Sequence, residues 1–212
     1  LETPFYTIAL DENGHFTSIF DKENDREVLK PGQVGNLLRL YEDKPVYYDN
    51  WDIDAYYTEK SWPVNDLQSM QWTEDGPVRT TLALTWRCSR STITQKIHFY
   101  ADTRRIDFET VATFEVQFGN VTRKVHTNTS WDKARFESCA QKWMDFSEGN
   151  YGVSLLNDCK YGHSVRDGVI GLTLIKCGVE PNPNADVEVH TFTYALMPHA
   201  GSWKTAGTVA EA

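Results

Sequence analysis

Short segments in which apolar and polar residues alternate recur along nearly the whole chain, and turn-forming residues separate them. Such a period-2 pattern puts successive side chains on opposite faces of a strand. Segment 5–10, the turn signal at 11–14 and segment 15–20 together predict a β-hairpin. No window keeps a 3.6-residue period over three helical turns, so few or no helices are expected. The sequence therefore predicts an all-β fold, built as a large antiparallel β-sandwich.

Most of the remaining chain fits the same pattern. Further strands are expected at 27–29, 36–41, 67–73, 78–87, 93–100, 106–110, 113–118, 142–146, 151–156, 169–175 and 187–196. The exception is the stretch 42–66, which is irregular and rich in aromatic and acidic residues. A loop of this length inside a compact domain is more often functional, or ordered by a neighbour, than idle.

Charge and composition exclude several classes of partner. The formal net charge of −9 disfavours nucleic acid and anionic membranes, which both attract basic patches. No apolar run approaches the roughly 20 residues that span a bilayer. The 4 cysteines stand far apart without a CxxC pair, which indicates free thiols in a reducing compartment. We therefore expect no nucleic acid partner and no membrane partner.

The motifs of a self-sufficient active site are missing. The 6 histidines form no HxH or HxxxH pair, and no GxSxG, P-loop or GxGxxG occurs. The chain also begins at Leu1 and stops in a short polar tail, which predicts a piece of a longer protein. We expect no catalytic residue and no metal site within this piece.

One polar cluster directly follows a predicted buried strand. Residues 151–156 are mostly apolar, and Asn157, Asp158, Lys160 and Tyr161 come next. Polar side chains on a loop held by a rigid strand are a common way to present chemistry. A second interpretation is a tight turn in which the Asn and Asp side chains bond their own backbone and Gly162 takes a positive φ.

The aromatic and acidic loop suggests a carbohydrate ligand. Sugars offer apolar C–H faces that stack on aromatic rings, and hydroxyl groups that bond to carboxylates, amides and ammonium groups. Trp51, Asp52, Asp54 and Tyr56 in this loop fit such a ligand together with the polar cluster that follows the strand at 151–156. The alternative is that Trp51 and Tyr56 plug the end of the sandwich, and that the two acids form a solvated loop face.

Five sequence strings resemble one enzyme family. They are NWDID at 50–54, FGNV at 118–121, NTSWDKARFE at 128–137, YGVSLLNDCKYG at 151–162 and HTFTYALMPH at 190–199. In content and order they are similar to the C-terminal part of the family 38 α-mannosidases, in the intracellular branch found in bacteria and as the cytosolic eukaryotic enzyme. The resemblance covers nearly the whole chain, 1–212.

The resemblance implies that other domains of a longer enzyme hold the chemistry. In this family a barrel-like N-terminal domain carries the zinc ligands and an aspartate nucleophile, and a helical bundle follows. The C-terminal part is a supersandwich similar to galactose mutarotase, which packs on the catalytic domain. The implied reaction is retaining hydrolysis of terminal α-mannosyl linkages by two carboxylates. The implied partners are the N-terminal catalytic and helical domains and an α-mannoside, with zinc or cobalt in the full enzyme and a cytoplasmic location. Assembly into a homo-oligomer is left open.

The same resemblance assigns substrate-binding positions. Asp158, Lys160 and Tyr161 occupy the loop from which relatives project a charged side chain toward the active site. We expect Lys160 or Asp158 to bond the substrate or to orient the catalytic carboxylates. In the second loop, Asp52 and Asp54 are candidates to reach the sugar, with Trp51 as an apolar wall.

Two further expectations concern structure. We expect Trp131 to be a buried aromatic anchor with Arg135 paired beside it. After residue 111 the relatives continue through roughly two more strands, on the order of twenty residues, before the equivalent of residue 112. Removing a hairpin would expose sheet edges, so a segment left out between Val111 and Ala112 is the expected cause.

Two rival functions remain at this point. One is a free-standing carbohydrate-binding module, which would carry a sugar cleft of its own with a polar rim. The other is a mutarotase-like epimerase, which would need a His and a Glu converging in one cleft. An apolar docking face for a barrel would instead favour the mannosidase domain.

Overall fold

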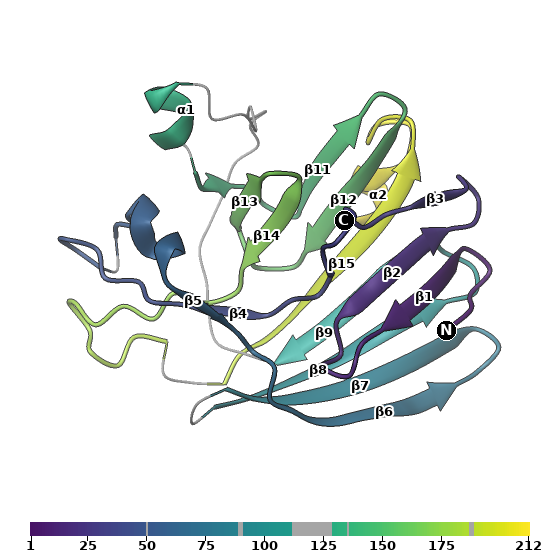
Figure 1. The fold of residues 1–212 in the computed structure, drawn as a ribbon, viewed down its shortest axis with the longest axis horizontal. Helices are drawn as coiled ribbons and strands as arrows, with labels where there is room; N and C mark the ends of the chain where they lie inside the picture. The colour runs from purple at the N-terminus through teal and green to yellow at the C-terminus, as the bar shows by residue number, and fades with distance from the viewer. Residues whose placement is uncertain (50, 89–90, 112–128, 135, 187–188) are drawn as a thin grey trace.

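The computed structural model describes residues 1–212 except 50, 89–90, 112–128, 135 and 187–188. Strands dominate the described chain, and its two α-helices and one 3-10 helix are short: α1 (Ser130–Ala134), α2 (Thr208–Glu211) and η1 (Ala55–Glu59). The all-β prediction is therefore confirmed (Figure 1). Among the described residues, no helix combines the length and the apolar character needed to cross a membrane.

Seven antiparallel strands form the large sheet, in the order β11-β12-β15-β9-β8-β7-β6. They are β6 (Leu67–Asp75), β7 (Arg79–Cys88), β8 (Ser91–Tyr100), β9 (Ile106–Val111), β11 (Trp143–Glu148), β12 (Tyr151–Asn157) and β15 (Thr191–Ala200). The late strand β15 pairs with β12 on one side and with β9 on the other. It therefore joins the two halves of the sheet.

Three smaller sheets complete the fold. The first is β1 (Tyr6–Leu10), β2 (Phe16–Asp21) and β3 (Arg26–Glu27); the second is β4 (Arg39–Tyr41) with β5 (Ser61–Pro63); the third is β10 (Ser138–Cys139), β13 (Gly162–Arg166) and β14 (Val169–Thr173). The first sheet lies over β7, β8 and β9, whereas β4, β5, η1, β13 and β14 gather beside the sandwich (Figure 1).

The core lies between the β1–β2 hairpin and the middle of the large sheet. Alternate residues of β7 supply Leu82, Leu84 and Trp86, each at most 1% exposed, and β1, β2, β8 and β9 supply the rest of this cluster together with Val64, which follows β5. The hairpin turn closes on this core, because the Trp86 indole N–H donates to the carbonyl of Asn13 at 2.9 Å. Gly14 takes φ +82° there, and an added Cβ would come within 3.0 Å of the Leu84 side chain.

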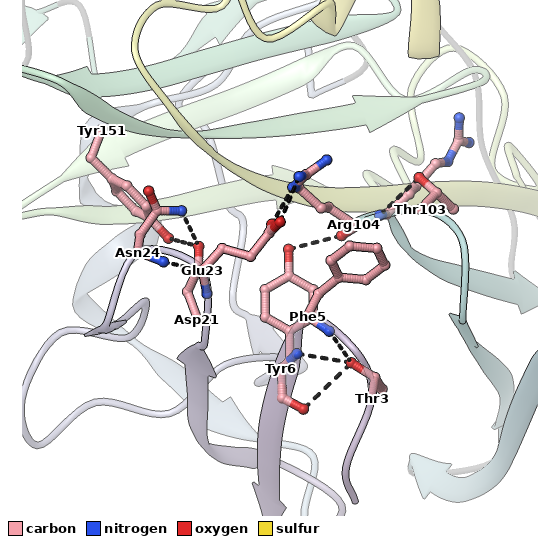
Figure 2. A network of polar contacts seen from close by, with 10 residues as sticks. Thr3, Phe5, Tyr6, Asp21, Glu23, Asn24, Thr103, Arg104 and Tyr151 are labelled. Atoms are coloured by element: carbon pink, nitrogen blue, oxygen red, sulfur yellow. Dashed lines mark hydrogen bonds and ion pairs between the residues drawn. The ribbon is translucent and has the colours of Figure 1, made fainter.

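Polar contacts also tie the small sheet to the large one (Figure 2). The Tyr6 hydroxyl donates to the Arg104 carbonyl at 2.9 Å, and Glu23 forms an ion pair with the Arg104 guanidinium. The Tyr151 hydroxyl donates to Asp21 Oδ2 at 2.9 Å. Burial raises the pKa of both Tyr6 and Tyr151, so both phenols stay protonated as donors at neutral pH.

The C-terminal segment covers the opposite face of β11, β12 and β15. Strand alternation turns Ser154 away from the core face that its neighbour Leu155 occupies. Ser154 Oγ lies 2.7 Å from Thr208 Oγ1 in α2, and the Trp143 and Trp203 rings lie 4.7 Å apart. This end of the sheet is therefore packed on both faces.

Most strand predictions are confirmed, with corrections at the ends of elements. The hairpin at 5–20 and the strand at 151–156 are present. The strand expected at 36–41 is limited to 39–41, and the one expected at 187–196 runs from 191 to 200. The strand expected at 113–118 and the junction after Val111 fall on or against residues outside the described chain, so both stay predictions.

Candidate functional site

The aromatic loop, which we define as residues 42–60, presents its large rings to solvent. Tyr47, Tyr48 and Trp51 are 70%, 66% and 72% exposed. Their ring centroids follow one another at 6.1 and 5.7 Å. The exposure contradicts the interpretation that Trp51 plugs the sandwich. Large exposed rings of this kind indicate an interaction surface for a ligand or for another protein domain.

A lysine from a distant segment fastens this loop. Lys176 Nζ donates to the backbone carbonyls of Asp49 and Asp52 and lies 3.6 Å from Asp43 Oδ2. The Asp49 carboxylate in turn accepts from the backbone N–H groups of Val179 at 2.7 Å and Glu180 at 3.0 Å. The sequence analysis missed Lys176, because nothing in a strand pattern connects residues more than 120 positions apart.

The two predicted acids of the loop have different environments. Asp54 Oδ2 accepts from the Tyr56 hydroxyl at 2.7 Å and from the Val46 N–H at 3.0 Å. The hydrogen bond from Tyr56 is the main reason that the pKa of Asp54 is lowered. The Asp52 side chain is exposed, and its Oδ1 accepts from the N–H of Ile53 at 3.0 Å. Asp54 therefore shapes the loop, and Asp52 is open to a ligand.

The polar loop, residues 157–162, is held by one hydrogen bond within the loop and by several to the segments at 141–142 and 193. Asn157 Oδ1 accepts from the Lys160 N–H at 2.6 Å, and Asn157 Nδ2 donates to the Gln141 carbonyl at 2.6 Å. Asp158 Oδ2 accepts from the Thr193 N–H at 2.9 Å. The tight-turn interpretation is thus confirmed for Asn157. It is wrong for Asp158, whose carboxylate bonds the Thr193 backbone in β15, and for Gly162, which has no positive φ and instead begins β13 opposite Thr173.

Lys160 and Tyr161 turn inward to different degrees. The Lys160 side chain is only 2% exposed, and its Nζ lies 4.7 Å from the centroid of the Phe192 ring, in a cation–π contact. Tyr161 is half-buried, and its carbonyl accepts from the Ala140 N–H at 2.9 Å. Asp158 remains exposed. Within the polar loop, Asp158 is therefore the side chain best placed to meet a ligand.

A buried histidine beside the polar loop was also missed. His163 Nδ1 lies 3.1 Å from the Tyr161 carbonyl and therefore carries the proton that it donates. His163 Nε2 is buried without a hydrogen-bond partner among the described residues. Burial lowers the pKa of this imidazole, which favours its neutral form.

The structure places the predicted residues in two groups rather than one. Trp51, Asp52 and Asp54 belong to the aromatic loop, which is fastened to 176–180. Asp158 is bonded to β15, and the Tyr161 backbone to the residue after β10. Each group combines an exposed carboxylate with fixed backbone, and only the first adds exposed rings. Such groups can stack on and hydrogen-bond a polyhydroxylated ligand.

Trp131 is not the buried anchor that the sequence predicted. It lies in α1 and is 76% exposed, the second most exposed large hydrophobic side chain in the described chain. Its neighbour Arg135 lies outside the described residues. An exposed tryptophan on a single-turn helix is a further candidate for contact with another domain.

Comparisons with known proteins agree with one another. The model of the "Glycosyl hydrolases family 38 C-terminal domain" matches residues 1–112 and 110–184. Human "Alpha-mannosidase 2C1" is 35% identical over 99% of this chain, and "Alpha-mannosidase G" of Dictyostelium discoideum is 34% identical over 100% of it. The chain spans 22% of the length of each.

A solved structure shows the same fold. The crystal structure of an alpha-mannosidase from Enterococcus faecalis V583 superposes with a TM-score of 0.74 at 16% identity. The superposition covers 99% of this chain and 30% of that one. The two stretches of the family match meet at 110–112, beside the position where the sequence analysis expects a missing segment.

Proposed function

The chain belongs to glycosyl hydrolase family 38, as the C-terminal domain of that family, and from this we propose that it is the non-catalytic part of an α-mannosidase. The observation that carries the proposal is the family match over most of the chain, combined with relatives named as α-mannosidases that are several times longer. The cleaving carboxylates then belong to other domains of the whole protein, which hydrolyses terminal α-mannosyl linkages.

The chain's own contribution is to bind and to position. Trp51, Asp52 and Asp158 are exposed on backbone that is fixed by hydrogen bonds, so they can contact a sugar or the catalytic domain. Asp54 and Lys160 support these residues rather than contact a ligand, because Asp54 bonds within its loop and Lys160 is buried against Phe192. Tyr161 is half-buried, so its exposure lies between that of the exposed residues and that of the buried Lys160.

The metal is also assigned to other domains. The part of the chain that the structure describes brings together no group of three or more His, Cys, Asp or Glu side chains suited to a metal ion. We assign the ligands of zinc or cobalt to the other domains of the whole protein, and no step of the proposed role passes through the metal. The 4 cysteines are free, which supports a reducing, cytoplasmic compartment.

One assay tests this proposal. Hydrolysis of an aryl α-mannoside, with zinc or cobalt added, is measured for the chain alone and for the full-length protein that contains it. We expect turnover by the full-length protein only. Turnover by the chain alone would mean that the sandwich holds a complete active site, and would overturn its non-catalytic role. No turnover by either would overturn the mannosidase assignment.

A carbohydrate-binding module remains the second candidate, because the rings of Tyr47, Tyr48 and Trp51 are exposed in a row. It predicts that the chain alone binds mannosides with the affinity of the full-length protein. Calorimetric titration of both with methyl α-mannoside separates the two functions.

A further inference from the structure

Residues 1–2 lie beside β1 as the end of a second strand. The Leu1 backbone nitrogen donates to the Ile8 carbonyl at 2.9 Å, and the Leu1 carbonyl accepts from the Ile8 N–H at 2.9 Å. Glu2 forms an antiparallel bridge with Thr7. Two residues that exchange both hydrogen bonds are the hydrogen-bonded pair of an antiparallel ladder. Residues 1–2 are therefore the end of a hairpin arm whose other arm is β1.

A short turn joins the two arms. The Thr3 N–H donates to the Tyr6 carbonyl at 2.9 Å, and Thr3 Oγ1 accepts from the Tyr6 N–H at 2.8 Å. Lys22, which follows β2, donates from its Nζ to the Thr3 carbonyl at 2.8 Å and holds the turn against the small sheet. These contacts fix the direction of the first arm, which runs antiparallel to β1 along its outer edge.

β1 offers this arm more backbone than residues 1–2 use. In the described chain β1 lies at the edge of its sheet, in the order β1-β2-β3. The backbone groups of successive residues in a strand face opposite edges, so Leu10 faces the same outer edge as Ile8. The next residue, Asp11, faces the other way, since its N–H donates to the His15 carbonyl at 2.9 Å. The Leu10 N–H and C=O therefore come next along the outer edge.

The edge strand β6 leaves part of the core face of the large sheet open. Met70 and Trp72 pair with Leu84 and Leu82, so they lie on the face that carries the core. Leu82 and Leu84 are at most 1% exposed, whereas Met70 is 43% and Trp72 is 49% exposed. The Trp72 ring also lies 6.4 Å from the ring of the core residue Phe99. The core face is therefore only half covered at β6.

The outer edges of β1 and β6 lie on the same side of the sandwich. At the opposite edge of the small sheet, Arg26 of β3 is paired with Glu148 of β11 at 3.2 Å, so β1 lies toward β6 (Figure 1). Leu1 and Leu10 both pack against the core cluster. A strand that continued from Leu1 along β1 toward Leu10 would enter the seam, by which we mean the space between the outer edges of β1 and β6.

The comparisons indicate what fills the seam. The chain matches a C-terminal domain and spans 22% of the length of its relatives, so the longer protein has a large part that precedes it. We propose that the residues immediately before Leu1 in the longer protein continue this arm along β1 and close the seam over Met70 and Trp72. The second residue before Leu1 pairs with Leu10, faces the core and is apolar. The first faces solvent, opposite the exposed Ala9.

This strand connects the preceding domain to the core of the sandwich by main-chain hydrogen bonds rather than by a free linker. It also protects two strand edges that would otherwise be open to pairing with other chains. The inference needs the longer protein but does not depend on its activity.

The first test is residue-resolved hydrogen–deuterium exchange on the full-length protein. We expect the Leu10 amide to exchange at a rate close to that of Ile8, and roughly tenfold more slowly than the exposed turn amide of Glu12. Proline at the second position before Leu1 removes the N–H that bonds the Leu10 carbonyl, so it should speed the Leu10 exchange roughly tenfold. Proline at the first position before Leu1 is the matched control, because the N–H there faces away from β1.

A second pair of variants tests the seam from within this chain. Met70→Asp puts a carboxylate under the proposed strand and should speed the Leu10 exchange roughly tenfold. Val78→Asp is its control, because Val78 is a 63% exposed apolar residue in the turn after β6, and it should leave the rate unchanged. The amide of the core residue Leu82 reports in each variant whether the sandwich stays folded.

Exchange at Leu10 as fast as at Glu12 in the parent protein would overturn the proposal, and this measurement stands even if a variant unfolds. Protection that neither the inner proline nor Met70→Asp disturbs would also overturn it, because something else would cover the edge. Protection that is lost on dilution, together with a halved mass in light scattering, would assign the edge to a second copy and overturn it as well. The expected exchange in a protein that hydrolyses no aryl α-mannoside would support this inference and overturn only the mannosidase assignment.

Discussion

Tyr151 donates its hydroxyl hydrogen bond to Asp21 across the sandwich, at 2.9 Å, and both residues are buried (Figure 2). Asp21 also accepts from the backbone N–H groups of Glu23 at 3.0 Å and Asn24 at 3.1 Å. One carboxylate therefore joins the end of β2 to the start of β12. This contact connects the small sheet to the half of the large sheet that carries the polar loop.

Removing that hydroxyl should weaken the fold. Tyr151→Phe keeps the ring and leaves a buried carboxylate with one donor fewer, so we expect a loss of about 1–3 kcal/mol in the free energy of unfolding. Urea denaturation of the purified chain measures it. Tyr47→Phe is the control, because Tyr47 is 70% exposed and should change stability by less than about 0.5 kcal/mol. Equal stability of the two variants would contradict a role for the Tyr151–Asp21 contact.

A second buried carboxylate joins β11 to β12 and β15. Asp145 Oδ1 accepts from Ser154 Oγ at 2.8 Å and lies 2.8 Å from His199 Nε2, with both ion-pair side chains at most 6% exposed. Asp145→Ala leaves His199 Nε2 without this partner and Ser154 Oγ with only Thr208 Oγ1, and we expect a loss of about 1–3 kcal/mol. Glu148→Ala, at an exposed carboxylate paired with Arg26, should cost less than about 1 kcal/mol. Chemical denaturation compares the two, and a small loss for both would show that the buried network contributes little.

The sequence predicted the sandwich because its core follows local rules. Leu82, Leu84 and Trp86 alternate along one strand, and the turn at 11–14 marks the first hairpin. The candidate site depends on long-range contacts, which local sequence patterns do not predict. Lys176 reaches Asp49 and Asp52 from 127 and 124 positions away, so only the folded chain brings the three together. Burial of Trp131 was likewise predicted from its residue type alone and is wrong, because this large apolar side chain lies on an exposed helical turn.

Lys176 should control the order of the aromatic loop. Lys176→Met removes the donor to Asp49 and Asp52 and leaves the half-buried Asp43 without its cation. Burial already raises the pKa of Asp43, and the loss of Lys176 should raise it further. Hydrogen–deuterium exchange of peptides from 43–54 should become about tenfold faster or more, consistent with the loss of two charge-assisted hydrogen bonds.

The control for that experiment is Lys22→Met, in which a lysine paired with Glu2 is removed far from the loop. Exchange in 43–54 should keep its parent rate in this variant. If Lys176→Met also left the exchange unchanged, the loop would be ordered by its rings and by the contacts of Asp49 alone, and the fastening role of Lys176 would be wrong.

Glu137 should give the fold a measurable pH dependence. Burial raises the pKa of its carboxyl above the ordinary value of 4.5, against the opposing hydrogen bond from Tyr57 and the charge of Arg166. A raised folded-state pKa means that its contribution to stability is complete below pH 4.5 and is lost as the pH rises through the raised value. Glu137→Gln should therefore flatten the stability profile just above pH 4.5. Urea denaturation at a series of pH values checks this, and parallel profiles would contradict it.

Lys160 should act on catalysis through position rather than by contact with substrate. Its ammonium is buried over the Phe192 ring, at 4.7 Å from the centroid, whereas Asp158 next to it is exposed. Lys160→Met keeps the packed stem and removes the ammonium group, so the full-length protein should remain folded. Because a misplaced polar loop affects the transition state more than binding, we expect kcat for an aryl α-mannoside to fall about tenfold or more, with KM nearly unchanged.

Asp158→Asn provides the contrast. An amide oxygen still accepts from the Thr193 N–H, so the loop keeps its backbone contact and loses one exposed charge. If Asp158 touches the sugar, this variant should raise KM, which Lys160→Met should not do. A rise in KM for Lys160→Met would mean that the ammonium itself reaches the substrate. Unchanged kinetics for both would remove the polar loop from the pocket and leave the aromatic loop as the part of this domain that meets the sugar.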